Sequence, residues 1–143
     1  MMSAGLHLAL VKAYHAQKNR TRPGMVKIGL SPGQPKVLDY LSCHDRCMQK
    51  EIAEAFDIEP ATVSQILVNM EQAGLVRRSA PGERKRAESI RLTEKGKKAY
   101  GGWVRLCRKI EAESLKGFSR QESEQFLCCL KRMYRNLTGK EMD

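Results

Sequence analysis

Apolar residues recur at helical spacing in two short segments between residues 48 and 73. In the first segment, Ile52 and Phe56 are one helical turn apart. In the second, the apolar positions are spaced i, i+3, i+4 and i+7, and they are Val63, Ile66, Leu67 and Met70. Between the segments, Asp57 tolerates the left-handed backbone that ends a helix, and Pro60 suits the first turn of a new one. The pattern therefore predicts two helices joined by a tight turn.

The side of the second predicted helix that faces away from its apolar stripe carries short, neutral residues. These residues are Ala61, Thr62, Ser64, Gln65 and Asn69. Hydroxyl and amide side chains can meet base edges or phosphates, and a small Ala lets a helix approach DNA closely. The same face also suits a solvated helix of a core bundle. The sequence that follows favours the DNA-binding interpretation.

A β-hairpin is predicted directly after the second helix. Gly74 ends that helix, residues 75–78 (LVRR) have the pattern of a short strand, and residues 89–92 (SIRL) that of the returning strand. The turn between the strands carries three adjacent cations, Arg84, Lys85 and Arg86. Such a tip can reach phosphates or a narrow minor groove, where the potential is most negative. We therefore predict that the tip contacts DNA.

Two helices are predicted on the N-terminal side. The first covers residues 3–19, and a loop over residues 19–30 follows it, with one Pro and two Gly. The second begins at Ser31 as its N-cap, with Pro32 at the first helical position and Gln34 placed as in a capping box.

Two more helices are predicted after the hairpin, over residues 94–116 and from residue 119 to 137. Gly101 and Gly102 lie inside the first of them and predict a kink or a close helix crossing. The first and last helices of the chain carry broader apolar faces than a small winged domain can cover. This breadth predicts intertwined terminal helices in a homodimer.

Composition narrows the choice of partner. The 143 residues suit one domain, and the formal net charge of +10, with a pI of about 9.6, favours a polyanion, with nucleic acid ahead of an anionic membrane. No apolar run approaches the roughly 20 residues of a membrane span, so no membrane association is expected. The N-terminus lacks the pattern of a signal peptide, so the expected location is the cytoplasm.

The five cysteines indicate reduced thiols. Five is an odd number, and Cys128 and Cys129 are adjacent on a predicted helix, where they point to different sides. Cys43 and Cys47 flank His44, but this spacing is not a two-residue knuckle, and no second Cys/His cluster completes a set of four ligands. We therefore expect neither a metal nor a cofactor.

Several segments together resemble the MarR (multiple antibiotic resistance regulator) family of winged-helix transcription factors. The segments are LSP at 30–32, EIA at 51–53, ATVS at 61–64, MEQAGLVRR at 70–78 and IRLTEKG at 90–96. Their order and spacing agree with the family over residues 29–96, and the run ending in LTEKG is the most specific. The flanking helices agree with the family only in pattern.

The resemblance implies a mostly α fold with a small β-wing in a single domain, residues 1–143. Its parts would be a winged helix-turn-helix over residues 30–92 and dimerisation helices over residues 1–20 and 94–138. The protein would be an obligate homodimer and a ligand-responsive repressor. It would bind a pseudo-palindromic operator in double-stranded DNA, with its recognition helices in successive major grooves and its wings in the flanking minor grooves.

By position in the family pattern, the five polar and small residues of the second helix face the groove, and Arg86 is the wing-tip arginine. The family commonly has Asp two residues before that arginine, whereas this chain has Arg84. The usual position of a basic residue in the recognition helix is occupied by Gln65, so base preference does not transfer from the family.

The resemblance also implies an effector site between the DNA-binding lobe and the dimerisation helices. His15, Tyr40 and Trp103 are the candidates for lining it, because aromatic side chains suit a small aromatic or phenolic effector. Residues of these types are more often ordinary core or interface residues.

Two alternatives stay open. One is a thiol- or metal-responsive DNA-binding regulator that uses Cys43 and Cys47, beside the basic His44 and Arg46. The other is a winged interaction module without a DNA role, which would not need a cationic tip beside a polar helix. The sequence contains no phosphate loop, paired-carboxylate site or Ser/His/Asp arrangement, so we do not expect an enzyme.

Overall fold

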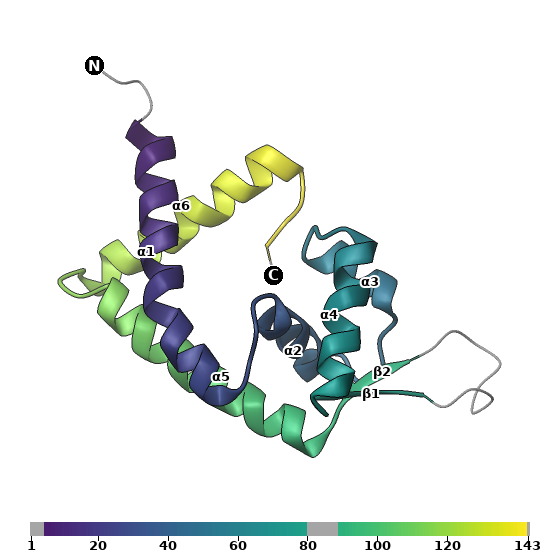
Figure 1. The fold of residues 1–143 in the computed structure, drawn as a ribbon. Coiled ribbons are helices and arrows are strands. Elements are labelled where there is room, and N and C mark those ends of the chain that lie inside the picture. Colours follow the sequence, from purple (N-terminus) through teal and green to yellow (C-terminus); the bar gives the residue numbers. More distant parts are fainter. Residues whose placement is uncertain (1–4, 80–88, 143) are drawn as a thin grey trace. The chain divides into compact units, whose positions relative to one another are not determined.

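The chain is mostly helical with one small antiparallel sheet in the computed structural model, which describes residues 5–79 and 89–142 (Figure 1). It divides into two compact units, residues 1–108 and 109–143. The elements are α1 (Gly5–Ile28), α2 (Gln34–Cys43), α3 (Gln49–Ala55), α4 (Pro60–Gln72), β1 (Val76–Arg78), β2 (Ile90–Leu92), α5 (Glu94–Ser114) and α6 (Arg120–Thr138). The predicted fold class, a winged helix-turn-helix flanked by helices at both ends, is confirmed.

The helix-turn-helix is α3 and α4, as the sequence predicts. Asp57 adopts a left-handed backbone with φ 53°, and the Ile58 N–H donates to the Ala53 carbonyl oxygen at 3.0 Å. Pro60 is the first residue of α4. An N–H at this position would have no partner within the helix, so the proline costs no hydrogen bond. The Gln49 side-chain amide donates to the Pro60 carbonyl oxygen at 3.2 Å, which joins the starts of the two helices. This turn fixes the direction of α4.

The hydrophobic core lies where α2, α3, α4 and the hairpin meet. Burial of a Val, Leu, Ile or Met side chain contributes about 1.5–3 kcal/mol to the free energy of unfolding, so this cluster is the main source of stability. Among its fully buried members are Val37, Leu38, Ile52, Val63, Leu67, Met70 and Ile90. Three of the four stripe residues predicted for α4 belong to this list, and Ile66 is half-buried against the same cluster.

The hairpin pairs β1 with β2 in the antiparallel register Val76↔Leu92, Arg77↔Arg91 and Arg78↔Ile90. The loop after α2 adds a bridge at Cys47, whose N–H and carbonyl both pair with Ile90. The wing is therefore tied to α2 through this loop and to α4 through the short turn at residues 73–75.

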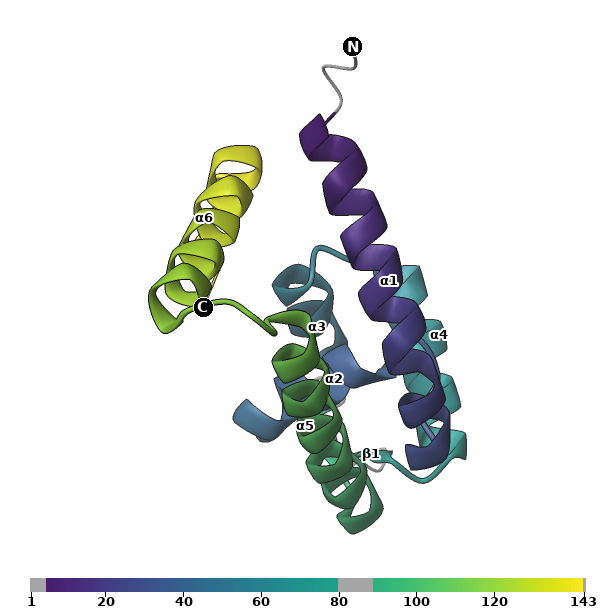
Figure 2. The same cartoon turned by 90° about the vertical axis from the view of Figure 1, so that its left-hand side faces the viewer.

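α1 is longer than predicted. The loop expected over residues 19–30 is wrong, because the helix continues through Pro23 to Ile28. A Cβ on Gly24 would lie 2.6 Å from a Leu106 methyl carbon, so α1 packs closely on α5 here (Figures 1 and 2). This packing keeps residues helical that, by their own propensity, favour a loop. Gly29, with φ 87°, then ends the helix.

α2 begins two residues later than predicted. Its N-cap is Gly33, with φ 86°, and not Ser31. One half of the predicted capping box is present, since the Gln34 side-chain oxygen accepts a hydrogen bond from the Ser31 N–H at 3.0 Å. Residues 31–34 therefore form a turn that leads into the helix, and buried Gln34 has its oxygen satisfied.

The two glycines inside α5 do not break that helix. A Cβ on Gly102 would touch the Ile28 side chain at 3.4 Å, so this glycine lies where α1 and α5 cross, as one of the two predicted explanations requires. At its start, α5 is capped by Thr93, whose hydroxyl accepts from the Gly96 N–H and donates to the Gly74 carbonyl.

The unit formed by residues 109–143 contains the last turns of α5 and all of α6. Ser119 and Glu122 form a capping box at the start of α6, with hydrogen bonds of 2.7 and 3.1 Å. The Phe118 and Phe126 rings pack together with their centroids 6.0 Å apart. Most of the apolar face of α6 is nevertheless open to solvent, including Leu127 and Leu137.

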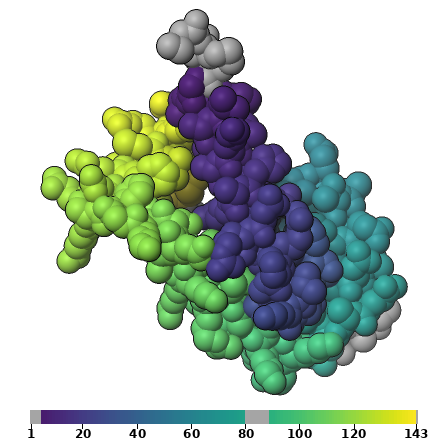
Figure 3. Space-filling view, turned by 60° about the vertical axis from the view of Figure 1, so that its left-hand side comes forward, coloured from purple at the N-terminus to yellow at the C-terminus, as the bar shows by residue number. Residues whose placement is uncertain are grey.

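Residues 5–20 of α1 are all exposed as well, and Figure 3 shows the helix on the surface of the molecule. Its exposed apolar side chains include Leu6, Leu8, Leu10, Val11 and Tyr14. None of the helices within residues 5–79 and 89–142 has the length and hydropathy needed to traverse a lipid bilayer.

Candidate nucleic-acid interface

The recognition helix of this fold is α4, and it presents the predicted face to solvent. Ala61, Thr62, Gln65 and Asn69 are exposed, and Ser64 is half-buried. This face lies opposite the buried Val63, Leu67 and Met70, because 3.6 residues complete one helical turn. The surface carries two amides and two hydroxyls around one small alanine.

Two of these side chains are already hydrogen-bonded to each other. The Gln65 side-chain amide donates to the Asn69 side-chain oxygen at 3.2 Å. Residues four apart lie one above the other on a helix, so the bond holds the Gln65 amide along the helix axis. Gln and Asn amides can form paired hydrogen bonds with adenine in the major groove. This pair is therefore the most chemically specific part of the surface.

The N-terminal turn of α4 favours an anion such as a DNA phosphate. The helix dipole places partial positive charge at this end. Pro60 carries no N–H and the Thr62 N–H donates to the Glu59 carbonyl oxygen at 3.0 Å, so the dipole rather than a set of free N–H groups is what attracts an anion here. Thr62 lies in this first turn, next to exposed Ala61. A phosphate contact here would set the depth at which α4 enters a groove.

α4 is held firmly on the sides that do not face solvent. A Cβ on Gly33 would lie 2.8 Å from an Ile66 methyl carbon, which shows how closely the turn before α2 approaches α4. At the other end, the Arg78 guanidinium lies 3.4 Å from the Glu71 carboxylate and so links β1 to α4. The wing and the recognition helix therefore have a defined relation at the base of the hairpin.

The predicted contacts of the wing tip, Arg84, Lys85 and Arg86, lie outside the described residues. The base of the wing is described, and it carries a feature that the sequence analysis did not identify. Arg77 on β1 and Arg91 on β2 are directly opposite each other in the register. Arg91 lies between Ile90 and Leu92, and this alternation is a signal in the sequence that its side chain points away from the apolar face of β2. Arg77 is exposed and Arg91 is half-buried.

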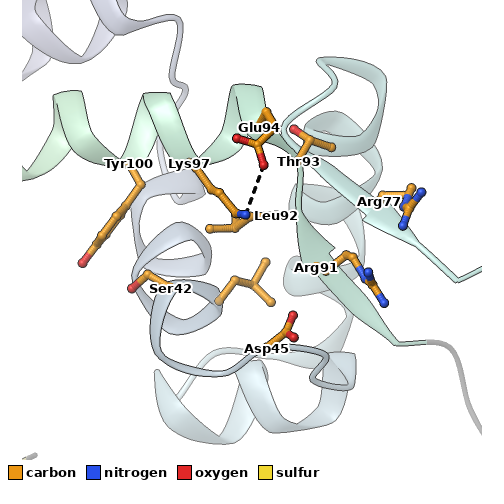
Figure 4. Close-up of a pocket in the computed structure, with 10 residues that line it drawn as sticks. Ser42, Asp45, Arg77, Arg91, Leu92, Thr93, Glu94, Lys97 and Tyr100 are labelled. Carbon is orange, nitrogen blue, oxygen red and sulfur yellow. Dashed lines mark hydrogen bonds and ion pairs between the residues drawn. The ribbon is translucent and has the colours of Figure 1, made fainter.

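These two arginines border a cavity of about 760 Å³ (Figure 4). One side of the cavity comes from the end of α2 and the following loop, and another from the first turns of α5. The other lining residues are Leu41, Ser42, Asp45, Leu92, Thr93, Glu94, Lys97 and Tyr100. The pKa of Tyr100 is raised. A hydrogen bond with the Ser42 hydroxyl lowers this pKa, but burial and the nearby Asp39 carboxylate together raise it by more.

The three candidate effector residues do not line this cavity. Tyr40 and Trp103 are half-buried and both pack against the hydrophobic core. Tyr40 also stacks on His44, with ring centroids 4.0 Å apart and an interplanar angle of 11°. His15 is exposed on α1, and its ring lies edge-on to Tyr14. Their role in effector binding stays a prediction.

Cys43 and Cys47, the two cysteines considered for a thiol or metal switch, lie in different surroundings. Cys43 is exposed, whereas Cys47 is buried. Burial, and then the nearby Glu51 carboxylate, raise the pKa of the Cys47 thiol to about 11, so it is protonated at neutral pH and a poor nucleophile. Within the described ranges, no three His, Cys, Asp or Glu side chains gather as metal ligands would. The structure gives no support to a switch at Cys47.

Residues 30–87 match the model of the MarR family. This match covers α2, the helix-turn-helix and β1, and it contains four of the five segments that suggested the family, while the fifth, at residues 90–96, lies beyond it.

Solved structures of MarR regulators share the fold along nearly the whole chain. A MarR family regulator from Silicibacter pomeroyi is 24% identical, with a TM-score of 0.77 over 96% of this chain and 93% of that one. MepR of S. aureus, solved as a DNA complex, is 24% identical, with a TM-score of 0.76 over 94% and 96%. MarR of Staphylococcus aureus, solved with salicylate and kanamycin, is 19% identical, with a TM-score of 0.85 over 96% and 93%.

These likenesses establish the fold, and the family model matches the part of the chain that contains the helix-turn-helix and β1. The described elements agree with both, since α4 and β1 follow each other inside the matched segment. Residues 30–87 are therefore similar to the MarR family model, and the chain has the fold seen in solved MarR transcriptional regulators.

Proposed function

We propose that the protein is a homodimeric, ligand-responsive repressor that binds a pseudo-palindromic operator. The observation that carries this proposal is the exposed face of α4. It combines two amides, two hydroxyls and a small alanine on a helix that is fixed from behind by the core. A solvated helix face of a soluble protein would more often carry Lys and Glu than this neutral set.

The DNA contacts divide by their chemistry. Gln65 and Asn69 would read base edges, and Ala61 would allow close approach. Thr62 and Ser64 would hold phosphates near the start of α4. The wing-tip cations, Arg84, Lys85 and Arg86, would enter the minor groove, as the sequence predicts. The DNA complex of MepR, a protein of the same fold, supports this arrangement.

The homodimer is supported by apolar surface on both terminal helices. Leu6 of α1 is 72% exposed and Leu137 of α6 is 76% exposed. Large apolar side chains gathered on one face mark an interaction surface. A second copy would cover these faces, and a two-fold axis would then match the symmetry of a palindromic operator.

Ligand response would act through the spacing of the two recognition helices. They must lie about one DNA turn, roughly 34 Å, apart to enter successive major grooves. An effector that favours another spacing by about 1–3 kcal/mol would weaken binding roughly 5–150-fold. His15, Tyr40 and Trp103 are the proposed lining of that effector site. The salicylate complex of a MarR protein with this fold supports a small aromatic ligand.

The test is selection of bound sequences from a pool of random DNA duplexes at two salt concentrations. We expect a palindromic motif with half-sites about one turn apart. Gln65→Ala should change base preference at one position of each half-site. Arg86→Ala should weaken binding to every DNA sequence and lower by about 1 the slope of log affinity against log salt concentration. Gln121→Ala and Arg108→Ala replace exposed residues of the same types outside the interface and should change nothing. Salt-sensitive binding without any motif would contradict the proposal.

A further inference from the structure

The positive charge of the chain lies outside its winged helix-turn-helix. Residues 30–92 contain nine Lys and Arg and nine Asp and Glu, so their formal charges cancel. Residues 1–29 contain five Lys and Arg and no acidic residue, and the first carboxylate of the chain is Asp39 on α2. Half of the net charge of +10 is therefore carried by the segment that forms α1. Such an asymmetry indicates a surface for a polyanion outside the recognition lobe.

Three of these cations are exposed on the second half of α1, and they are Lys18, Arg22 and Lys27. In the part of the chain that the structure describes, none of them lies within 4.0 Å of an Asp or Glu carboxylate. The Lys18 ammonium lies 6.0 Å from the centre of the Tyr14 ring, a contact that leaves its charge in place. Lys18 and Arg22 are four residues apart, where like charges repel along a helix. A bound anion would relieve that repulsion.

The apolar side of this half of α1 is already covered by the protein itself. A Cβ on Gly24 would lie 2.6 Å from a Leu106 methyl carbon, and Met25 and Ile28 pack against the core. Val26 is exposed, but a single exposed valine is ordinary on a soluble surface. A helix that lies in a membrane surface needs a free apolar face, which residues 18–28 do not offer. The surface therefore suits a hydrophilic polyanion.

The three cations lie on two flanks of the helix. At about 100° per residue, Lys18 and Arg22 are on one flank of the packed side and Lys27 is on the other. An α-helix with its side chains is about 10–12 Å wide, and the major groove of DNA is about 12 Å wide. Cations on both flanks can therefore each meet the phosphates of one strand.

We propose that residues 18–27 of α1 bind the sugar-phosphate backbone of double-stranded DNA at a second site, separate from α4 and the wing. The site would not read sequence, because phosphate contacts carry no sequence information. Figure 1 shows α1 and the hairpin on opposite sides of α2, so the two sites would hold different DNA segments. One protein would thereby join two duplexes. This site does not depend on the operator proposed above.

Lysine footprinting of the wild-type protein tests the surface without any operator. Exposed lysines are acetylated with and without a duplex of scrambled sequence, and the modified positions are read by mass spectrometry. We expect the duplex to protect Lys18 and Lys27 at low salt and not at high salt. Lys98 and Lys131, exposed lysines on other helices, are the controls and should be modified equally in both samples. Unprotected Lys18 and Lys27 would overturn the proposal.

A triple substitution then measures the contribution of the three cations. It should weaken binding to scrambled duplex about tenfold or more at low salt and lower by about 2–3 the slope of log affinity against log salt concentration. The variant is Lys18→Gln, Arg22→Gln and Lys27→Gln. A control variant that loses the same charge elsewhere should keep the wild-type slope, and it is Lys98→Gln, Arg108→Gln and Lys131→Gln. Equal losses in both variants would mean that net charge alone attracts DNA, and would overturn the proposal.

A bridging experiment tests the second DNA segment. Wild-type protein bound to a duplex on beads should retain a free, labelled duplex, and the α1 triple variant should not. Retention by both proteins would assign the bridge to the two recognition lobes and overturn the proposal. Protection of Lys18 and Lys27 by phosphatidylglycerol vesicles or by RNA, but not by duplex DNA, would do the same. A failed search for an operator motif would contradict the repressor and leave these measurements decisive for α1.

Discussion

At the scale of single residues, Gly96 is where α5 comes closest to the hairpin. A Cβ at this position would overlap the Leu75 carbonyl oxygen, a backbone atom that cannot rotate away. Gly101, one and a half turns later, has no such neighbour, since the nearest atom to a Cβ there is the Arg105 guanidinium at 3.5 Å. Two glycines of one helix therefore have opposite consequences for stability.

Replacing each of them by alanine tests this difference. Gly96→Ala should lower the free energy of unfolding by more than about 2 kcal/mol, because either the backbone or the helix must shift. Gly101→Ala should raise it by up to about 1 kcal/mol, because alanine is the better helix former. Urea midpoints of both variants measure the effect. A lower midpoint for Gly101→Ala would contradict the open surroundings of this residue.

The Cys47 thiol makes the free energy of unfolding depend on pH in the alkaline range. Burial raises the pKa of its thiol from an ordinary 9.0 to about 11 in the folded protein. Between these values the unfolded chain releases the proton and the folded chain keeps it. The contribution of this thiol is therefore fully present below pH 9 and is lost as the pH rises to about 11.

Comparison with Cys47→Ala isolates this thiol from the lysines and tyrosines that titrate in the same range. The stability difference between wild type and variant should shrink from pH 8 to pH 11 in urea unfolding experiments. Parallel stability curves over that range would show that Cys47 has no raised pKa. At pH 8, an alkylating reagent should modify exposed Cys43 in the folded protein and reach Cys47 only after unfolding.

At the scale of elements, the helix-turn-helix was predictable because its signals are local. Helical spacing, a left-handed Asp57 and an opening Pro60 all act within one or two turns. The end of α1 was not predictable in this way. Pro23 and Gly24 indicate a loop when only their neighbours are considered, and it is packing against α5, some eighty residues later, that keeps them helical. Long-range packing overrode local propensity here.

A double-mutant cycle tests that packing. Gly24→Val should lower the free energy of unfolding by about 1–3 kcal/mol, because its side chain would meet Leu106. In a Leu106→Ala background the same substitution should cost less, with a coupling of about 0.5–3 kcal/mol. Gly5→Val, at a position with open space around it, is the control and should change little. Additive costs would mean that Gly24 and Leu106 do not pack together.

At the scale of the whole molecule, the fold and the recognition face followed from the sequence, but the cavity did not. Periodicity is enough to place Ala61, Thr62, Gln65 and Asn69 on one exposed face. The cavity draws its lining from α2, both strands and α5, and no local pattern shows that these segments meet. The facing of Arg77 and Arg91 depends on the register of the hairpin, which only the folded chain fixes.

The net charge of +10 and the exposed apolar side chains of α1 and α6 have opposite effects on the association of two copies of the chain. A strongly cationic chain repels its own copies, so a dimer needs enough apolar burial to offset that repulsion. Exposed leucines on α1 and α6 supply such surface, and DNA phosphates between the two lobes would reduce the repulsion further. Dimerisation and operator binding should therefore reinforce each other.

A charge placed on the apolar face of α6 tests the dimer. Leu127 is 53% exposed, so Leu127→Glu should fold normally yet sediment as a monomer, because the glutamate would be buried against a second copy. Gln125→Glu adds the same charge to the opposite side of the same helical turn and should sediment like the wild type. The monomer should keep salt-dependent DNA binding but lose its preference for two half-sites, since each lobe would bind alone. If Leu127→Glu sedimented as a dimer with intact operator specificity, the apolar face of α6 would have some other partner, and α1 would have to supply the subunit contact by itself.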